Sequence, residues 1–451
     1  MTSNISIAPS PENGLATKFS AAKLLRFAFP TILMMIFFGL YTIIDTIFVA
    51  RYVGTDALSA INIVTPVIGL IVGLGTMMAA GGSALIAWEM GNGRNDTARQ
   101  IFSLIVLVTS VAGCIIALAG LIWISPLLHL LGASELLMPL GRDYLGTLFV
   151  FVPANMMQVL FASLLITAGR PGLGMLVGVA GGLANILFDY LFIVGFSMGI
   201  RGAALATGIG YLVPAIAGLL FFWLNRRGTL FFCRPKPDVR ALLKSAYNGS
   251  SEMIGQASTA ITVFLFNMAM MDRLGEDGVA AITIMIYSQF LLSSVFIGFS
   301  MGVAPVISYL HGQADREALR RVVAICLRAV AAVSIAVTML LLSQGWFVVG
   351  LFAPESSHVH AISREGFLIF PYAFLFIGTN IFFSALFTAL SNGTLSVLLS
   401  FCRNLLIACS IVVMPRFLGV SGLWLAVPFA ECASLGLAVW IAAMNRQRYG
   451  Y

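Results

Sequence analysis

Twelve long apolar segments, each about the length needed to cross a lipid bilayer, dominate this sequence of 451 residues. Hydrophobic residues make up 60% of the chain and charged residues 10%, whereas an ordinary soluble domain is about 45–50% apolar and about 25% charged. The composition therefore excludes a soluble enzyme, a disordered chain and a nucleic-acid-binding protein. It predicts an all-α polytopic membrane protein. Its spans are expected near 24–50, 58–87, 100–125, 143–168, 173–195, 201–225, 241–271, 279–310, 320–350, 365–390, 394–416 and 420–445.

Lysine and arginine are distributed unevenly between the two sides that these spans define. If both termini and the even-numbered loops share one side, that side carries 17 of them and the other carries 6. Because cytoplasmic loops of membrane proteins are enriched in Lys and Arg, we expect both termini in the cytoplasm of a bacterium and the spans in its inner membrane. The longest loop is basic, and it either only sets this topology or also binds anionic lipid.

The two halves of the chain repeat one pattern. A shift of 221 residues, or of 220 near the ends of the halves, superposes glycine-containing motifs in the same order. The matched pairs include Gly54 and Gly275, Gly81 and Gly302, Gly91 and Gly312, and Gly199 and Gly419. A repeat with an even number of spans runs in one direction, and two such lobes rocking about a cleft indicate a transporter.

This repeat divides the chain into five parts. We predict a disordered cytoplasmic N-terminus (1–20), an N-terminal six-helix lobe (21–225), a basic cytoplasmic inter-lobe loop (226–240), a C-terminal six-helix lobe (241–445) and a cytoplasmic tail (446–451).

Carboxylates within spans mark candidate functional sites, because each costs about 2.5–3.5 kcal/mol to insert unless it faces protein or water. Asp45 and Asp189 are expected at similar depths in the outer half of the N-terminal lobe, with Asn185, Thr207 and Tyr41 nearby. Two close carboxyl groups in a low dielectric should share a proton, and Tyr41 is placed to donate a hydrogen bond to Asp45. An oxygen-only set suits H⁺ or Na⁺, so we predict a coupling-ion site, with a purely structural polar cluster as the alternative.

A second group of charges lies within the C-terminal lobe. Glu252 and Arg403 are each about ten residues, or roughly 15 Å at 1.5 Å per residue, from the ends of their spans, and Glu431 is near the middle of the last span. These depths allow a Glu–Arg–Glu polar network, in which pairing lowers the cost of each buried charge. The network is either a structural set of ion pairs or a direct participant in substrate or proton handling.

The remaining features predict neither an enzyme nor a cofactor. The six cysteines are scattered, and no set of His, Cys or Ser resembles a nucleophile or a metal cluster, so the only metal we expect is Na⁺ at the N-lobe site. The 20 methionines and 34 phenylalanines either pack the core or line an adaptable cavity for bulky ligands. We expect no nucleic-acid partner, and a monomer can contain the full transport cycle.

Four motifs of the chain resemble the MATE family, the multidrug and toxic compound extrusion transporters. They are the segments 41–54, 91–94, 185–193 and 202–207. The resemblance implies twelve helices in two bundles that form a V, and cation-coupled antiport of organic cations. It carries a cation site over onto Asp45, Asn185, Asp189 and Thr207. Another branch of the family has an Asp in the tenth helix, which segment 372–386 lacks, so the chain is closer to the DinF- and MepA-like branches.

These observations together predict a secondary efflux transporter that exchanges small cationic or amphiphilic substrates for H⁺ or Na⁺. The alternative is a lipid-linked saccharide flippase of the same superfamily. Carrying a pyrophosphate should require several arginines in the cavity, and only Arg403 lies clearly within a span. A channel is disfavoured by the duplicated lobes. Membrane lipid is the only other partner that we expect.

Overall fold

A computed structural model describes residues 14–226, 228–352 and 357–450 of the chain. Within these ranges the chain forms helices, turns and loops, and no strands. Residues 1–13 and 451, which belong to the predicted N-terminus and tail, lie outside the described residues. The elements are α1 (Ala21–Phe48), η1 (Val49–Val53), α2 (Thr55–Gly91), α3 (Asn95–Ile122), α4 (Ile124–Leu130), α5 (Leu137–Val150), α6 (Val152–Thr167), α7 (Pro171–Asp189), η2 (Tyr190–Gly195), α8 (Gly199–Leu224), α9 (Val239–Gly312), α10 (Arg316–Phe352), α11 (His358–Ile369), η3 (Phe370–Ala373), α12 (Phe374–Ala389) and α13 (Gly393–Tyr449).

The described residues contain twelve membrane-spanning segments. Nine helices are long and apolar enough to span, and α5 with α6, bent by 53°, forms a tenth, broken span. At 1.5 Å per residue, the 74 residues of α9 would reach about 110 Å, far more than the hydrocarbon thickness of about 30 Å. Helix α9 therefore holds two spans divided at Gly275, and α13 holds two divided at Gly419.

Glycines with positive φ mark the same turns in both halves of the chain. Gly275 has a φ of 64° and its repeat partner Gly54 a φ of 118°, while Gly419 and its partner Gly199 have φ values of 61° and 60°. Side chains disfavour this left-handed backbone region, which glycine adopts freely. The internal repeat is thus present in the backbone conformation as well as in the sequence.

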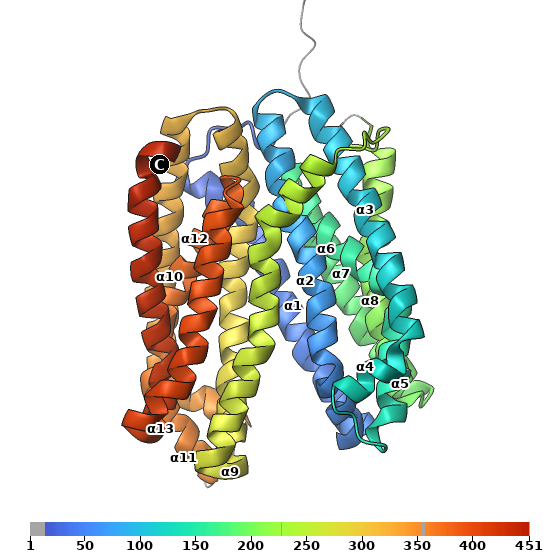
Figure 1. Cartoon of the computed structure of the whole chain (residues 1–451), viewed down its shortest axis with the longest axis vertical. Coiled ribbons are helices and arrows are strands. Elements are labelled where there is room, and N and C mark those ends of the chain that lie inside the picture. The colour runs from blue at the N-terminus through green and yellow to red at the C-terminus, as the bar shows by residue number, and fades with distance from the viewer. Residues whose placement is uncertain (1–13, 227, 353–356, 451) are drawn as a thin grey trace, which may run out of the picture.

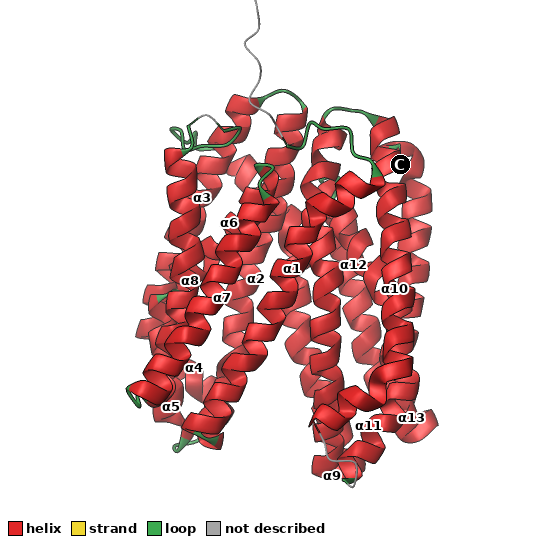
Figure 2. Ribbon diagram, turned by 180° about the vertical axis from the view of Figure 1, so that it is seen from behind, coloured by secondary structure: helices red, strands yellow, loops and turns green. Residues whose placement is uncertain are grey.

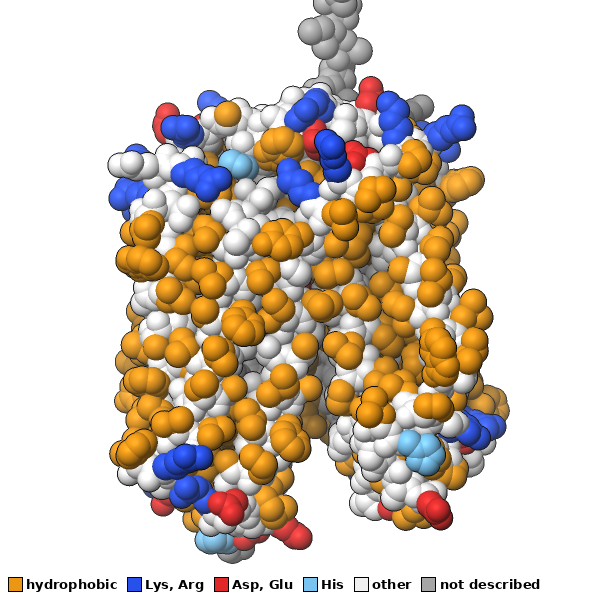
Figure 3. Space-filling view, in the orientation of Figure 1, with side chains coloured by type: hydrophobic (Ala, Val, Ile, Leu, Met, Phe, Trp, Pro, Cys, Tyr) orange, Lys and Arg blue, Asp and Glu red, His pale blue; other side chains and the backbone are white. Residues whose placement is uncertain are grey.

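Two bundles of helices form a V (Figure 1), and the view from behind shows the same separation (Figure 2). The bundles meet at the end where α13 finishes, here named the closed end, and diverge toward the opposite, open end. The space-filling view shows the cleft between the lobes at the open end, apolar flanks, and basic side chains gathered at the closed end (Figure 3). The predicted pair of pseudo-symmetric six-helix bundles is confirmed.

Glycines bring the two lobes into backbone contact near the closed end. A Cβ on Gly81 of α2 would overlap the carbonyl oxygen of Ser245 and approach Gly249 of α9. Gly302 is the repeat partner of Gly81, and it packs in the same way against Ala28 of α1. At the shift of 221, Ala28 is in turn the repeat partner of Gly249. Small residues allow such close approach of membrane helices.

Gly91 and Gly312, which are repeat partners, contact each other across this junction. An added Cβ on Gly91 would overlap the carbonyl oxygen of Tyr309, and one on Gly312 would overlap that of Trp88. A residue can touch its own symmetry partner only near the symmetry axis. The pseudo-twofold axis therefore passes between these glycines.

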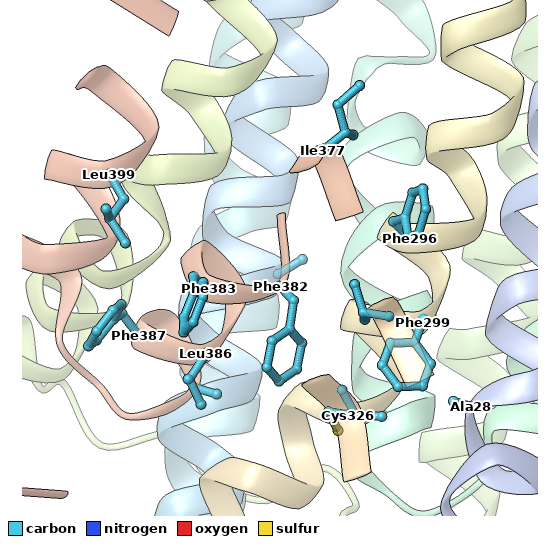
Figure 4. Close-up of a cluster of buried hydrophobic side chains, with 14 of the residues drawn as sticks. Ala28, Phe296, Phe299, Cys326, Ile377, Phe382, Phe383, Leu386, Phe387 and Leu399 are labelled. Atoms are coloured by element: carbon cyan, nitrogen blue, oxygen red, sulfur yellow. The ribbon is translucent and has the colours of Figure 1, made fainter. Parts of the chain in front are cut away.

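Large apolar side chains fill the interior of the C-terminal lobe. Phe296 and Phe299 of α9 face Phe382 and Leu386 of α12 (Figure 4), and each of the four is at most 5% exposed. Because lipid tails are as apolar as these side chains, close packing rather than hydrophobic burial holds such helices together.

The segment before α1 is packed on the protein. Leu15 is fully buried, and the ring of Phe19 lies edge-on to that of Phe27, with their centroids 5.7 Å apart. Ser20 then caps α1 by accepting a hydrogen bond from the amide of Lys23. Residues 14–20 belong to the segment 1–20 that we predicted to be disordered, but two apolar side chains, Leu15 and Phe19, hold this stretch on the protein.

Candidate functional site

The two N-lobe carboxylates lie beside turns of π-helix. Asp189 is the last residue of α7 and precedes η2, while Asp45 lies four residues before η1. The two π-helical segments contact each other. Such widened turns are rare and occur frequently at functional sites. The periodicity of apolar residues in the sequence does not predict these turns.

The predicted N-lobe residues come together in the structure. The carboxyl groups of Asp45 and Asp189 lie within electrostatic reach of each other. Asp189 is fully buried and Asn185 is 2% exposed, and the Asn185 amide donates a 3.5 Å hydrogen bond to the Thr207 hydroxyl. Two ionised carboxylates in one buried cluster repel each other, so a proton or a cation would stabilise this arrangement.

Several oxygens of this cluster have no protein donor. Asp45 Oδ1, Asn185 Oδ1 and both carboxylate oxygens of Asp189 are buried without a hydrogen bond. Buried polar atoms without partners are costly, so these oxygens are candidates to bind a ligand. The atoms are all hard oxygens, which suits H⁺ or Na⁺.

Tyrosines surround the paired carboxylates. Tyr41 of α1, Tyr144 of α5 and Tyr211 of α8 all lie within electrostatic reach of Asp45. Among the described residues no hydrogen bond joins Tyr41 to Asp45, although the sequence placed them one turn apart. Asn155 of α6 lies with Tyr211 beside this cluster, and its side-chain oxygen is buried without a hydrogen bond.

Tyr144, Asn155 and Tyr211 are the members that sequence reasoning missed. Asn155 and Tyr211 also line a small pocket, whose other walls are apolar side chains of α2, α5 and α6. For Tyr211 a signal was available, because it follows Thr207 by four residues on the same helical face.

The C-lobe charges form a closed pair. The Arg403 guanidinium donates hydrogen bonds of 2.6–3.0 Å to both carboxylate oxygens of Glu431, which is fully buried. Asn380 of α12, which was not predicted, donates a 2.6 Å hydrogen bond to the same carboxylate. Glu252 lies apart, because no hydrogen bond or ion pair joins it to any described residue. The expected Glu–Arg–Glu network is therefore an Asn–Glu–Arg cluster.

We expect the substitution Arg403→Gln to destabilise the protein by about 3–5 kcal/mol, because it leaves the Glu431 carboxylate buried without its counter-charge. The double variant Arg403→Gln/Glu431→Gln should recover most of this loss and keep ion-coupled transport. The melting temperature of the purified protein measures the first effect, and liposome transport the second. If Glu431→Gln alone keeps the melting temperature but stops coupled transport, a structural role for this pair is wrong.

The described residues contain no group of three or more His, Cys, Asp or Glu side chains placed to hold a metal ion. All six cysteines are unbridged. The N-lobe cluster thus remains the candidate functional site on the described part of the chain.

The family model MatE matches residues 30–191 and again residues 253–414, once in each lobe. The chain belongs to the MatE family.

Relatives of this MatE protein match along nearly its whole length. The multidrug export protein MepA of Staphylococcus saprophyticus is 20% identical over 430 residues, which cover 94% of each chain. A protein of Shewanella oneidensis named FAD transporter is 24% identical over 445 residues, 96% of each chain. Both of these relatives are named as transport proteins.

Solved structures share the fold. An outward-facing multidrug resistance MATE family transporter of the MOP superfamily matches with a TM-score of 0.92 at 20% identity, over 98% of this chain and 99% of that one. A MATE protein in complex with MaL6 matches with a TM-score of 0.92 at 20% identity, over 97% and 99%. This MatE protein therefore has the two-lobed fold of these transporters.

Proposed function

We propose that this membrane transporter exports organic cations and drugs in exchange for H⁺ or Na⁺ bound at the N-lobe cluster. The observation that carries the proposal is the pair of close carboxyl groups, with buried oxygens that have no protein donor. Such a pair has an affinity for cations that depends on its surroundings, so a change of conformation can load and unload it. Tyr41, Asn185 and Thr207 complete the site.

The orientation of the cycle follows from charge. Basic residues crowd the closed end, which favours a cytoplasmic closed end with both termini in the cytoplasm of a bacterium and the spans in its inner membrane. The cleft then opens to the outside. H⁺ or Na⁺ enters from the outside and neutralises Asp45 and Asp189, and a bound organic cation loses its counter-charges and leaves. Release of the ion to the cytoplasm restores the negative charge.

This exchange requires that ion and substrate each bind the two conformations with different affinity. The glycine contacts at the closed end must separate when the cleft opens to the cytoplasm. One chain contains both lobes and the whole cluster, so a monomer suffices for the cycle.

The flippase alternative has less support. A lipid pyrophosphate needs several free cations in the cavity, and Arg403 is already engaged by Glu431. FAD should also be tested as a cargo, because the relative in Shewanella oneidensis is named an FAD transporter. FAD is anionic, so it would not compete with H⁺ or Na⁺ for the N-lobe carboxylates.

Reconstituted wild-type protein tests the proposal. We expect ethidium to leave loaded proteoliposomes when either an inward proton gradient or an inward Na⁺ gradient is imposed, and the effective gradient identifies the ion. Dissipating that gradient with an ionophore should stop the efflux, and protein-free liposomes provide the background. If no cationic dye moves under either gradient, organic-cation antiport is wrong. Movement of FAD instead would assign the cargo to the other class.

A further inference from the structure

The described part of the loop that joins the lobes, residues 228–238, is fastened to the N-terminal lobe. The amide of Cys233 donates a 3.0 Å hydrogen bond to the Ser103 hydroxyl of α3, and the Arg99 Nε donates a 3.0 Å bond to the carbonyl oxygen of Thr229. Leu230 is 1% exposed. The loop is therefore a fixed platform on α3 and not a free tether.

Aromatic side chains strengthen this attachment. The Phe232 ring packs against Phe102 of α3, with their centroids 5.1 Å apart, and against Trp223 at the end of α8 at 6.4 Å. The Arg99 guanidinium lies 4.3 Å from the centroid of the Phe231 ring. These contacts fix the position of the loop relative to the ends of α3 and α8.

Unpaired cations lie where the platform meets α9. Arg234, Lys236 and Arg240 are exposed, and no hydrogen bond or ion pair joins them to any described residue. The one acid in this stretch, Asp238, is engaged as the cap of α9, where it accepts a hydrogen bond from the Ala241 amide. Lys244 follows one turn after Arg240, with its ammonium 4.9 Å from the centroid of the Trp88 ring.

Two acids at the neighbouring ends of α2 and α3 are already paired with other cations. Glu89 at the end of α2 pairs with Arg94 at 2.8 Å, and Asp96 at the start of α3 pairs with Arg99 at 3.0 Å. The positive charge of the platform is therefore left without a protein counter-charge in the described structure.

An apolar stripe continues from these cations into the membrane. Val239, Leu243 and Tyr247 recur every four residues on one face of α9 and are 54–65% exposed. Arg240 and Lys244 flank that stripe on the same helix. Cations at a helix end above an exposed apolar face match the layout of a phospholipid, whose charged headgroup lies above its acyl chains.

We infer that Arg234, Lys236, Arg240 and the Val239–Leu243–Tyr247 stripe bind an anionic phospholipid. The phosphate contacts the three cations, and the acyl chains lie along the stripe. Because the loop is fixed to the N-terminal lobe while α9 begins the C-terminal lobe, the bound lipid connects the two lobes. It therefore favours the conformation in which the closed end is shut, as any ligand favours the state that it binds better.

Lipid binding to the purified full-length protein tests this inference without any transport measurement, so its outcome is independent of the proposed function. Wild type in nanodiscs of phosphatidylcholine is titrated with phosphatidylglycerol or cardiolipin, and bound lipid is counted by native mass spectrometry. We expect the triple variant Arg234→Gln/Lys236→Gln/Arg240→Gln to lose roughly 100-fold in apparent affinity, at about fivefold for each cation.

A matched control removes three exposed cations from the open end, Arg51→Gln/Arg273→Gln/Arg364→Gln, and should keep the wild-type affinity. Equal losses in both triple variants would overturn the site, because they would show a dependence on net charge alone. If inorganic phosphate or soluble glycerophosphoglycerol bound to the wild type as tightly as the phospholipid, the inference would also be overturned. The ligand would then be a free anion and not a lipid.

The conformational part is tested with spin labels introduced at Glu135→Cys and Glu276→Cys, one on each lobe at the open end, in a background without other cysteines. Anionic lipid should increase the population with a long distance between the labels, and the triple variant should abolish this response. An unchanged distance distribution in the wild type would contradict the connection between the lobes.

Discussion

Replacing either Asp45 or Asp189 with asparagine is expected to reduce gradient-driven efflux to the level of protein-free liposomes, a loss of at least about 100-fold or roughly 2.7 kcal/mol. Asparagine keeps the size of the side chain but cannot be ionised, so the cluster loses the negative charge for which ion and substrate compete. Initial rates of ethidium efflux under an imposed gradient measure the effect.

The control for this experiment is Asp96→Asn, which removes one carboxylate from the surface, where 90% of the Asp96 side chain is exposed. It should transport like the wild type. Thr207→Val is expected to weaken coupling about fivefold, the worth of one hydrogen bond of about 1 kcal/mol. If both aspartate variants fold normally and still couple efflux to the gradient, the N-lobe ion site is wrong.

The second large effect is expected from glycines at the junction of the lobes. Gly81→Val and Gly249→Val should each prevent the closed end from shutting, because a side chain at either position overlaps backbone atoms of the facing helix. An overpacking cost of about 1–3 kcal/mol would shift the population of conformations about 5- to 150-fold. We expect transport to fall by a similar factor.

The same pair of spin labels at the open end detects this shift as a shorter distance. Gly69→Ala in α2 and Gly255→Ala in α9 are matched controls, because an added Cβ meets no atom within 4 Å at either position. These controls should be neutral or slightly stabilising, since alanine favours a helix by up to about 1 kcal/mol over glycine. A shut closed end in Gly81→Val would contradict the role given to this contact.

The sequence predicted the spans, the internal repeat and the N-lobe cluster because these depend on helical depth. Asp45, Asn185, Asp189 and Thr207 share one depth, and residues at one depth of a small bundle can meet. The function of the cluster as an ion site stays a prediction. Apolar composition and glycine spacing were enough to specify two similar bundles.

The depth of a residue along its helix does not determine which way its side chain points around the helix axis. Glu252 and Glu431 were both candidates for Arg403, and only the packing of α12 and α13 decides that Glu431 is its partner. Tyr144 and Asn155 reach the ion cluster from helices whose orientation the sequence left open. The attachment of the inter-lobe loop depends on matched surfaces far apart in the chain, such as Cys233 and Ser103.

The contact between Gly91 and Gly312 is the contact that a residue would make with its own copy in a homodimer of a six-helix protein. In such a dimer both copies would carry the same residues, so any ion site would occur twice. Joining the copies in one polypeptide allows them to differ. Tyr211 occupies in one lobe the position that Glu431 occupies in the other at the shift of 220. A fused chain can therefore carry one cluster of unpaired carboxylates in the N-terminal lobe and one neutralised ion pair in the other, so the proposed ion site would occur once in each protein.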